Sequence, residues 1–345
     1  MAEWKKLGEV CCIRTGKLNA NAQVKNGKYP FFTCDAKPFR IDTFAFDTEA
    51  ILISGNGSQV GHLNYYKGKF NAYQRTYVID DFRDVNAFYL FHYLKSTIRP
   101  YVMDKSKKGS VPYITLPMLE GFIFPIPSIE EQTRIVSILD TFTASIDNLK
   151  EQIAQRRKQY EYYRDQLLDL EGKEGVEMKI SDFCLLKAGK NISADDIVDN
   201  RIGNVFPCIG GNGLRGYVTQ YSHEGSYPVI GRQGALCGCV NWITGKFYAT
   251  EHAVVTTGKV NTDQRFLYYL FQNANLNQYK TQGAQPGLSV AKLNNVKFRI
   301  PSLQEQQRIV SILDTFEASI QNLEAQLSQR EKQYEYYRNK LLTFE

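Results

Sequence analysis

The 345-residue sequence has no run of about 18 apolar residues, the length that a membrane-spanning helix requires. Its N-terminus lacks the apolar core of a signal peptide, so we expect a cytoplasmic protein with no membrane partner. Hydrophobic residues make up 43% and charged residues 23%, which excludes a disordered or collagen-like chain. At about 100–200 residues per domain, the length predicts two or three domains.

Metal-binding residues are few and lack the spacing of a metal site. The seven cysteines are odd in number and scattered, unlike a disulfide framework. Cys237 and Cys239 stand one residue apart, which is not CxxC spacing, and the four histidines form neither HExxH nor HxxxH. We therefore predict no metal site and interpret the cysteines as buried apolar thiols.

Catalytic motifs are also missing. The sequence contains no GxSxG, no kinase motif set and no Asp-Pro-Pro-Tyr or Asn-Pro-Pro-Phe tetrapeptide of an amino-methyltransferase. The glycine-rich turns at 55–58 and 231–234 fit neither nucleotide-binding pattern, so we expect their glycines to serve turn geometry or close backbone approach. The sequence predicts a chain without chemistry of its own.

The second half of the chain repeats the first. Residues 126–170 and 300–344 are identical at about 31 of 45 positions, which indicates a duplication. The segments before these blocks repeat more weakly, as in the Gly-x-x-Pro-x-[Ile/Leu]-[Thr/Ser] motifs that begin at Gly109 and Gly283. Each half is thus a variable block followed by a near-identical block.

Each near-identical block predicts one long helix. Ser128 with Glu131, and Ser302 with Glu305, fit the S-x-x-E capping box. Apolar residues then recur at alternating three- and four-residue spacing, which is typical of a coiled coil. The first series is Leu139, Phe142, Ile146, Leu149, Ile153, Arg156, Tyr160, Tyr163, Leu167 and Leu170. The second is Leu313, Phe316, Ile320, Leu323, Leu327, Arg330, Tyr334, Tyr337, Leu341 and Phe344.

Arg156 and Arg330 interrupt these apolar series. A buried charge at a seam can fix register, and alternatively the side chain reaches out to solvent. The simplest partner for each helix is the other copy in the same chain. We expect antiparallel pairing, which places the variable blocks at opposite ends with pseudo-twofold symmetry; pairing between two chains is the alternative.

The variable blocks have a mixed α/β pattern. Short strands are predicted at 50–53 and 227–230, and buried helices at 89–94 and 266–271. A polar, glycine-bearing linker follows the first long helix. We predict an α/β fold in four segments: variable domains at 1–126 and 172–300, each followed by a helical segment, at 127–171 and 301–345.

The net charge of +6 is unevenly distributed. The two helical blocks carry 11 basic and 15 acidic residues, which leaves 31 basic and 21 acidic residues in the rest. Basic globular units are expected where a protein meets phosphate. The densest basic run, at 105–110, leads into the first Gly-x-x-Pro motif, although such a run is often only a solvated loop.

The candidate DNA-contacting residues combine cations for phosphates with amide and guanidinium groups for base edges. We predict phosphate contacts from Lys105, Lys107, Lys108 and Lys280. The candidates for base or backbone contacts are Gln59, Arg75, Ser110, Arg215, Arg232, Gln233, Gln282 and Gln285.

The paired blocks at 126–140 and 300–314, both of the form Ile-Pro-Ser-x-x-Glu-Gln-x-Arg-Ile-Val-Ser-Ile-Leu-Asp, follow a variable domain each. With their coiled-coil continuations and the Gly-x-x-Pro motifs, they make the chain resemble the specificity (S) subunit of Type I restriction-modification systems over essentially its whole length. The resemblance implies two target recognition domains, each reading one half of a bipartite site in double-stranded DNA. It implies that the helices pair antiparallel and set the spacer.

The resemblance also implies partners. Two modification subunits would dock on the chain, bring S-adenosylmethionine and methylate one adenine in each half-site. Restriction subunits would add an ATP-driven translocase and nuclease. The S chain itself would bind no cofactor and catalyse nothing.

One stripe of the predicted coil is a candidate partner surface. If Leu139 occupies heptad position a, then position c is identical in both copies and points away from the seam. We predict that this polar stripe, which ends in a tyrosine, contacts the modification subunits. Its candidate residues are Arg134, Gln155, Tyr162, Arg308, Gln329 and Tyr336.

Two other functions remain as alternatives. The chain could be a coiled-coil scaffold or adaptor that never touches DNA, which salt-dependent DNA retention with the modification partner would distinguish. It could also be an enzyme with an unrecognised site, for which methyl transfer by the isolated chain would be the sign.

Overall fold

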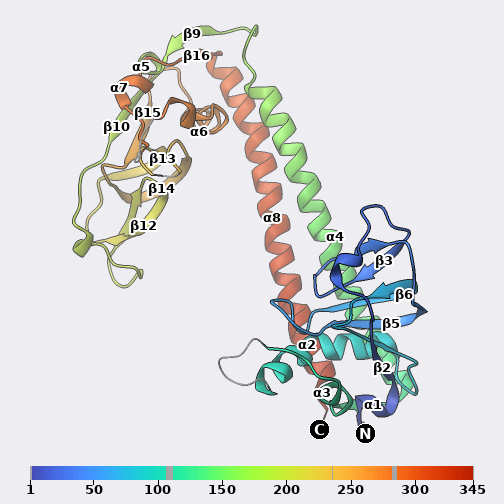
Figure 1. Ribbon diagram of the computed structural model, residues 1–345. Coiled ribbons are helices and arrows are strands. Elements are labelled where there is room, and N and C mark those ends of the chain that lie inside the picture. The colour runs from blue at the N-terminus through green and yellow to red at the C-terminus, as the bar shows by residue number, and fades with distance from the viewer. Residues whose placement is uncertain (1, 106–111, 235, 282–285, 345) are drawn as a thin grey trace. The chain divides into compact units, whose positions relative to one another are not determined.

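The computed structural model describes residues 2–105, 112–234, 236–281 and 286–344. The chain divides into two units (Figure 1). Unit 1 consists of Met1–Leu149 with Gln326–Glu345, and unit 2 is Lys150–Ala325. Each unit therefore holds one variable domain and part of both long helices. None of the helices in the described ranges is long and apolar enough to cross a membrane.

Unit 1 is built on a six-stranded sheet in the order β2-β7-β5-β6-β3-β4. All pairs are antiparallel except β3 with β6, which run parallel. The strands are β2 (Cys12–Thr15), β3 (Tyr29–Phe32), β4 (Phe39–Ile41), β5 (Phe46–Ser54), β6 (Leu63–Ala72) and β7 (Thr76–Asp80). A short 3₁₀ turn, η1 (Ala20–Ala22), lies between β2 and β3.

Unit 2 repeats this topology strand for strand. Its sheet runs β10-β15-β13-β14-β11-β12, again with a single parallel pair, between β11 and β14. The strands are β10 (Cys184–Ala188), β11 (Phe206–Gly210), β12 (Gly213–Val218), β13 (His223–Gly231), β14 (Val240–Ala249) and β15 (Ala253–Gly258). The 3₁₀ turns of this unit are η2 (Ala194–Asp196) and η3 (Leu276–Tyr279). The duplication inferred from the near-identical blocks thus extends to the variable domains.

A two-stranded sheet closes each domain before its long helix begins. In unit 1, β1 (Glu3–Lys6) pairs antiparallel with β8 (Ile123–Ile126). In unit 2, β9 (Val176–Lys179) pairs with β16 (Lys297–Ile300) in the same way. The short helices of these regions are α1 (Leu7–Val10), α3 (Leu116–Glu120), α5 (Ile180–Phe183) and α7 (Val290–Leu293). The pairing brings the start and the end of each variable domain together.

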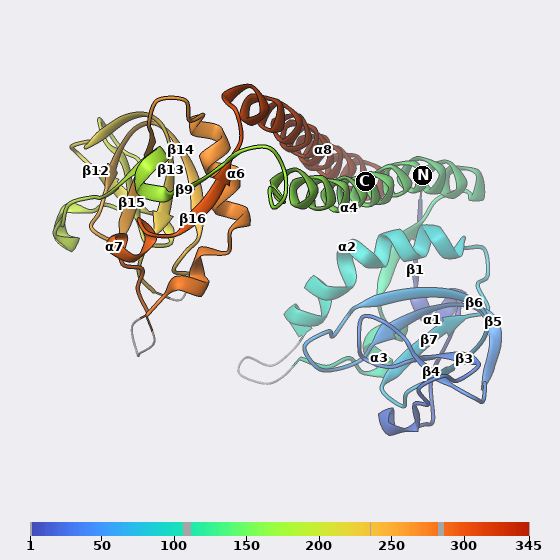
Figure 2. The same ribbon diagram turned by 90° about the horizontal axis from the view of Figure 1, so that it is seen from above.

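The main core of each domain lies between the sheet and one helix, α2 (Ala87–Lys105) or α6 (Gln264–Asn273). Figure 2 shows α2 beside the sheet of unit 1. Strand β5 alternates as a two-sided strand should: Ile51 and Ile53 pack in the core with α2, while Ala50 and Leu52 face a second apolar cluster. The predicted buried helices are confirmed.

The predicted strands at 50–53 and 227–230 are real but too short. Strands β5 and β13 each have nine residues, because their polar first halves pair with β6 and β14 as well. The apolar pattern of the sequence predicts only the half of each strand that is buried on both faces. The other half pairs in a hairpin but has no apolar pattern, so the sequence does not predict it as strand.

The two long helices, α4 (Ile129–Leu168) and α8 (Leu303–Leu342), pair antiparallel within each unit. In unit 1, Phe142 stacks on Tyr337 with ring centroids 5.3 Å apart. In unit 2, Tyr163 stacks on Phe316 at the same distance. Early residues of one helix meet late residues of the other, so antiparallel pairing inside one chain is confirmed.

The seam differs from the predicted series at three kinds of position. Tyr163 and Tyr337 remain 47% and 42% exposed, because each ring lies flat on a phenylalanine rather than between the helices. Leu170 and Phe344 lie beyond the helix ends. The two seam arginines are half-buried, and the Cζ atoms of Arg156 and Arg330 lie 5.9 and 5.7 Å from ring centroids of phenylalanines on the other helix.

A buried glutamine ties each long helix to its domain. Gln132 is fully buried, and its amide donates to the carbonyls of Asp84 and Pro127 and accepts from the N–H of Asn86. Gln306 makes the same three bonds in unit 2, to Asn261, Pro301 and Asp263. The preceding residue was predicted to close a capping box; the N–H of Glu131 does donate to Ser128 Oγ (3.3 Å), but its carboxylate pairs with Arg134.

Candidate nucleic-acid interface

Four segments of unit 1 meet at one end of the sheet, and we call this meeting point the loop junction. It comprises residues 33–35, 54–62, 73–76 and the motif residues 112–115. The Gly55 N–H donates to the Arg75 carbonyl (2.9 Å), and the Ile114 N–H donates to the Gly55 carbonyl (2.8 Å). Asn56 and Tyr113 form a β-bridge beside these bonds. The described part of the Gly-x-x-Pro motif, residues 112–115, thus pairs like a strand with the turn after β5.

Unit 2 builds the same junction from residues 210–212, 231–239 (apart from residue 235), 250–253 and 286–289. The Arg232 N–H donates to the His252 carbonyl (2.9 Å), and the Leu288 N–H donates to the Arg232 carbonyl (2.8 Å). Gln233 bridges Gly287 as Asn56 bridges Tyr113. Each backbone bond therefore has a counterpart in the other unit, while the side chains differ.

Glycines make these junctions sterically feasible. Gly57 and Gly61 have φ of +82° and +79°, and the equivalent Gly234 and Gly238 have +90° and +93°. A Cβ on Gly231 would lie 1.8 Å from the carbonyl oxygen of Gly211. The interpretation of the glycine-rich turns as sites of special geometry and close backbone approach is confirmed.

The structure places several predicted contact residues at the junctions. Gln59 and Arg75 are exposed in unit 1, and Gln233 is exposed in unit 2. Arg232 is only half-exposed and its Nε is buried, which leaves less of the guanidinium group for a ligand. Arg215 is exposed on β12, next to Gly210 at the edge of the junction.

Two predicted residues lie at helix ends, and others lie outside the described residues. Lys105 is the exposed last residue of α2, and Lys280 is the exposed residue that follows η3, where its charge acts on the Cys237 thiol of the unit 2 junction. The predicted contacts that lie outside the described residues are Lys107, Lys108, Ser110, Gln282 and Gln285.

Two cations of α2 were missed from the sequence. Lys95 and Arg99 line a hollow of about 210 Å³ with residues 59–63, which follow the glycine-rich turn. The Cα of Arg99 would lie 3.5 Å from a Cβ on Gly61. Both residues belong to a helix whose sequence predicts a buried core helix. Their positive charge lies at the junction only because of the three-dimensional fold.

Each domain is anchored to a long helix through an aspartate of the near-identical block. In unit 1, His92 Nε2 lies 2.8 Å from Asp140 Oδ1, and His92 is buried. Burial lowers the pKa of His92 below its usual value, although the hydrogen bond to Asp140 opposes this shift. In unit 2, the buried Tyr269 replaces the histidine and donates to Asp314 Oδ1 (2.5 Å).

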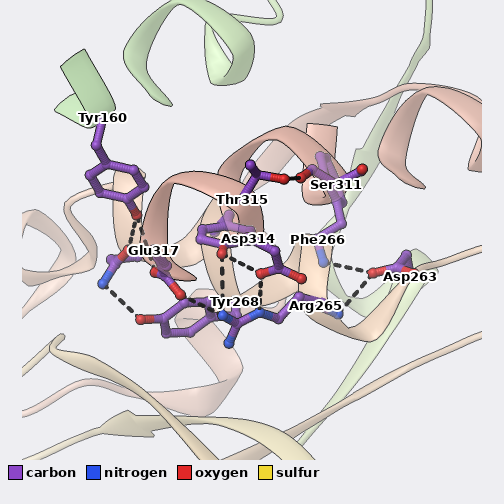
Figure 3. A network of polar contacts seen from close by, with 11 residues as sticks. Tyr160, Asp263, Arg265, Phe266, Tyr268, Ser311, Asp314, Thr315 and Glu317 are labelled. Atoms are coloured by element: carbon purple, nitrogen blue, oxygen red, sulfur yellow. Dashed lines mark hydrogen bonds and ion pairs between the residues drawn. The ribbon is translucent and has the colours of Figure 1, made fainter. Parts of the chain in front are cut away.

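Unit 2 extends this anchor into a charged network (Figure 3). The Arg265 guanidinium donates to Asp314 (2.8 Å) and Glu317 (2.5 Å), and it stacks against Trp242, with 4.8 Å from Cζ to the ring centroid. Tyr160, on the other long helix, donates from its hydroxyl to the Glu317 carboxylate (3.4 Å). The network joins helix α6 to both long helices within the unit, so its visible role is to position the domain.

The cysteines partly contradict their interpretation as buried thiols. Cys11, Cys184, Cys208 and Cys237 are buried, and burial raises the pKa of Cys11 and Cys184 to about 12. Three more are partly exposed (Cys12, Cys34 and Cys239), because they lie on a sheet edge or at a junction. All seven are free, and no group of metal-ligating side chains occurs among the described residues.

The predicted partner stripe is exposed along both helices. Arg134, Gln155 and Tyr162 are exposed, as are their counterparts Arg308, Gln329 and Tyr336. Tyr162 and Tyr336 are 62% and 61% exposed. Arg134 and Arg308 each hold a glutamate three residues earlier in a two-bond pair, which lowers the pKa of Glu131 and Glu305.

The exposed tyrosines are held by an aromatic stack that is the same in both units. Tyr162 packs edge-on against Tyr163 (5.4 Å between centroids), which lies on Phe316. In unit 1, Tyr336 packs against Tyr337 (5.3 Å), which lies on Phe142. Each exposed tyrosine ring is therefore held by a neighbouring tyrosine, which itself stacks on a phenylalanine of the other helix.

These features together define a class of protein: a duplicated α/β chain with two similar domains, matched loop junctions that carry different side chains, and a paired-helix spacer. The sequence profile of the "Type I restriction modification DNA specificity domain" family matches residues 1–156 and 173–331. The chain belongs to this family.

Individual relatives agree with this assignment. The chain is 33% identical over 355 residues to the Type I restriction enzyme EcoprrI specificity subunit of Escherichia coli, covering 91% of this chain and 87% of the relative. Its fold is similar to the S subunit of the Type I restriction-modification system from M. genitalium, with a TM-score of 0.73 at 18% identity and coverage of 100% and 97%. A chain solved in a study of complex assembly and conformational transition of the type I R-M system matches with a TM-score of 0.60 at 16% identity and coverage of 99% and 96%.

Proposed function

We propose that this chain is a non-catalytic DNA-targeting subunit in which each variable domain reads one half of a bipartite site. The observation that carries the proposal is the pair of loop junctions: the backbone bonds match one for one, but the side chains they present differ. A shared frame with different reading groups suits two different base sequences. The excess of basic residues outside the helices favours phosphate binding at both domains.

The partners and cofactors belong to the same proposal. Two modification subunits bind the chain, supply S-adenosylmethionine and methylate one adenine in each half-site. Restriction subunits supply ATP-dependent translocation and cleavage. The absence of known catalytic motifs from the sequence supports a chain that holds no cofactor and only directs its partners.

A map of methylated adenines in host DNA tests the proposal. It is recorded with this chain and the modification subunits present, and again with the gene for this chain deleted. We expect a bipartite motif that disappears on deletion. An unchanged map would contradict DNA targeting and favour the scaffold alternative.

The position-c stripe is the proposed contact with the modification subunits. Its support is the pair of exposed, stacked tyrosines, since a rigid aromatic ring with polar neighbours is typical of an interface anchor. We expect Tyr162→Ala combined with Tyr336→Ala to reduce recovery of modification subunits in a pull-down by tenfold or more.

The matched control uses two exposed lysines from heptad position f, which neighbours the stripe on the outer face of the same helices: Lys158→Ala with Lys332→Ala. We expect it to leave recovery unchanged. Equal recovery with the tyrosine variant and with the wild-type chain would remove the stripe from the proposal while leaving DNA targeting intact.

A further inference from the structure

Three positions at each loop junction are structurally equivalent between the units. Residues 35 and 212 each follow, by three residues, the parallel strand pairs Phe32↔Ala72 and Ile209↔Ala249. Residues 56 and 233 each bridge the Gly-x-x-Pro motif. Residues 75 and 252 each accept the matched backbone bond at 2.9 Å. Unit 1 has aspartate, asparagine and arginine at these positions, and unit 2 has asparagine, glutamine and histidine.

The three positions converge in both units. In unit 2, Asn212, Gln233 and His252 line one hollow of about 320 Å³ together with Gly211 and Gly234. In unit 1, the Cys34 thiol, next to Asp35, donates to Asn56 Oδ1 (3.0 Å) and approaches the Arg75 carbonyl (3.5 Å). The side chains of each set therefore leave the backbone within one small area.

The groups are accessible and are partly oriented by neighbours. Asp35 is exposed, and its carboxylate accepts from Thr33 Oγ1 (2.9 Å). His252 is 37% exposed, with Nε2 3.1 Å from the Glu251 carboxylate. Its Nδ1 is buried without a hydrogen-bond partner among the described residues, and so is the Nε of the neighbouring Arg232. Unpaired buried polar atoms at a solvent-facing hollow are expected where a polar ligand completes the bonding.

We infer that these matched triads are the base-reading groups of the two domains: Asp35, Asn56 and Arg75 in unit 1, and Asn212, Gln233 and His252 in unit 2. The inference rests on the proposed function and adds which residues carry sequence choice. Arginine pairs with guanine, asparagine and glutamine pair with adenine, and aspartate accepts from the cytosine amino group. Unit 1 therefore reads a half-site with a G·C pair facing Arg75, and unit 2 reads an A·T pair facing Gln233.

The Gly-x-x-Pro motif adds a second difference between the triads. Tyr113 is 57% exposed opposite Asn56, whereas the equivalent Gly287 has no side chain opposite Gln233. A Cβ on Gly287 would lie 3.8 Å from Gln233 Cγ, so a side chain at this position would contact the glutamine that lines the hollow. The glycine therefore leaves Gln233 without a side chain opposite it.

The test replaces one triad residue at a time in the full chain, assembled with the modification subunits, and maps methylated adenines in host DNA. We expect Arg75→Ala to reduce discrimination at one guanine of one half-site by about tenfold to hundredfold, and to leave the other half-site unchanged. We expect Gln233→Ala to do the same at one adenine of the other half-site. Lys69→Ala and Lys246→Ala are controls, because these lysines stack on Phe44 and Tyr221 at equivalent places outside the junctions.

The outcomes separate the inference from the proposed function. If the wild-type complex gives no bipartite motif, the proposed function fails and the inference fails with it. If the wild-type motif is clear and both alanine variants reproduce it in full, only the inference is overturned.

A variant that methylates nothing is resolved by competition binding of the assembled complex. The competitors are the wild-type site and duplexes with each base pair substituted in turn. Loss of discrimination at one pair of the expected half-site supports the inference, and unchanged discrimination at every pair overturns it.

Discussion

A single residue distinguishes the two anchors that fix each domain to its long helix. His92 and Tyr269 occupy equivalent positions, and each forms a hydrogen bond with the equivalent aspartate of a near-identical block, Asp140 or Asp314. Of the two side chains, only the histidine titrates near neutral pH. When His92 Nε2–H donates to Asp140, the buried Nδ1 has no hydrogen-bond partner in the part of the chain that the structure describes. Protonation would place a charge on this buried ring, and burial lowers the pKa of His92 for that reason.

We therefore expect the unfolding free energy to fall as the pH decreases below about 6.5, the usual histidine pKa. The folded state resists protonation of His92 while the unfolded chain accepts it, so the slope is at most about 1.4 kcal/mol per pH unit for this residue. Denaturant unfolding between pH 5 and 8 measures it. His92→Gln keeps a donor without titrating, and its curve should be flatter below pH 6.5.

The residual slope of that variant also has an expected source. Burial lowers the pKa of His223 as well, so unit 2 contributes a dependence of the same sign. If His92→Gln and the wild-type chain showed identical pH profiles, the anchor would not be the titrating group.

At the scale of the long helices, the two near-identical blocks differ in charge at the positions that form an ion pair between the helices. Arg157 bonds Glu324 across the seam at 2.5 Å in unit 2. The residue of α4 that corresponds to Glu324 is Lys150, and the residue of α8 that corresponds to Arg157 is Glu331. Pairing α4 with a second α4 would set Arg157 against Lys150, so the charges favour pairing within the chain over homodimerisation.

The partly exposed Arg157–Glu324 pair should be worth roughly 0.2–1 kcal/mol. We expect Glu324→Lys to lower the unfolding free energy by about 1 kcal/mol, because it turns attraction into repulsion. Adding Arg157→Glu should restore most of this loss, as measured by denaturant unfolding at low salt. Strictly additive losses in the double variant would show that the two side chains do not interact.

The helices also show what the sequence allowed one to predict. The long helices, their pairing and the exposed stripe depend on local periodicity, and they could be predicted from residues such as Leu139 and Tyr162. The antiparallel sense was predicted instead from the order of the variable blocks along the chain. The bonding of Gln132 and the convergence of Asn56 with Arg75 depend on segments far apart in the chain. Nothing in the local pattern marks Lys95 or Arg99, because their helix reads as core and their charge reaches the junction only in the folded domain.

At the scale of the whole molecule, charge is divided by role: the helical blocks are slightly acidic and the domains are basic. DNA affinity of the assembled complex should therefore fall steeply with salt, through phosphate contacts made by the domains. Lys95 and Arg99 lie beside the unit 1 junction without belonging to its triad. They should add affinity for any sequence rather than choice among sequences.

Replacing both residues with alanine tests this division. If each meets one phosphate, the slope of log affinity against log salt should become shallower by about 1.8, at about 0.9 per contact, while the methylated motif stays the same. Lys158→Ala with Lys332→Ala removes the same charge from the helices and should leave the slope unchanged. A motif altered by the Lys95 and Arg99 variant would assign these residues to base reading, and an equal change of slope in the control would mean that net charge alone, not its placement on the domains, governs DNA affinity.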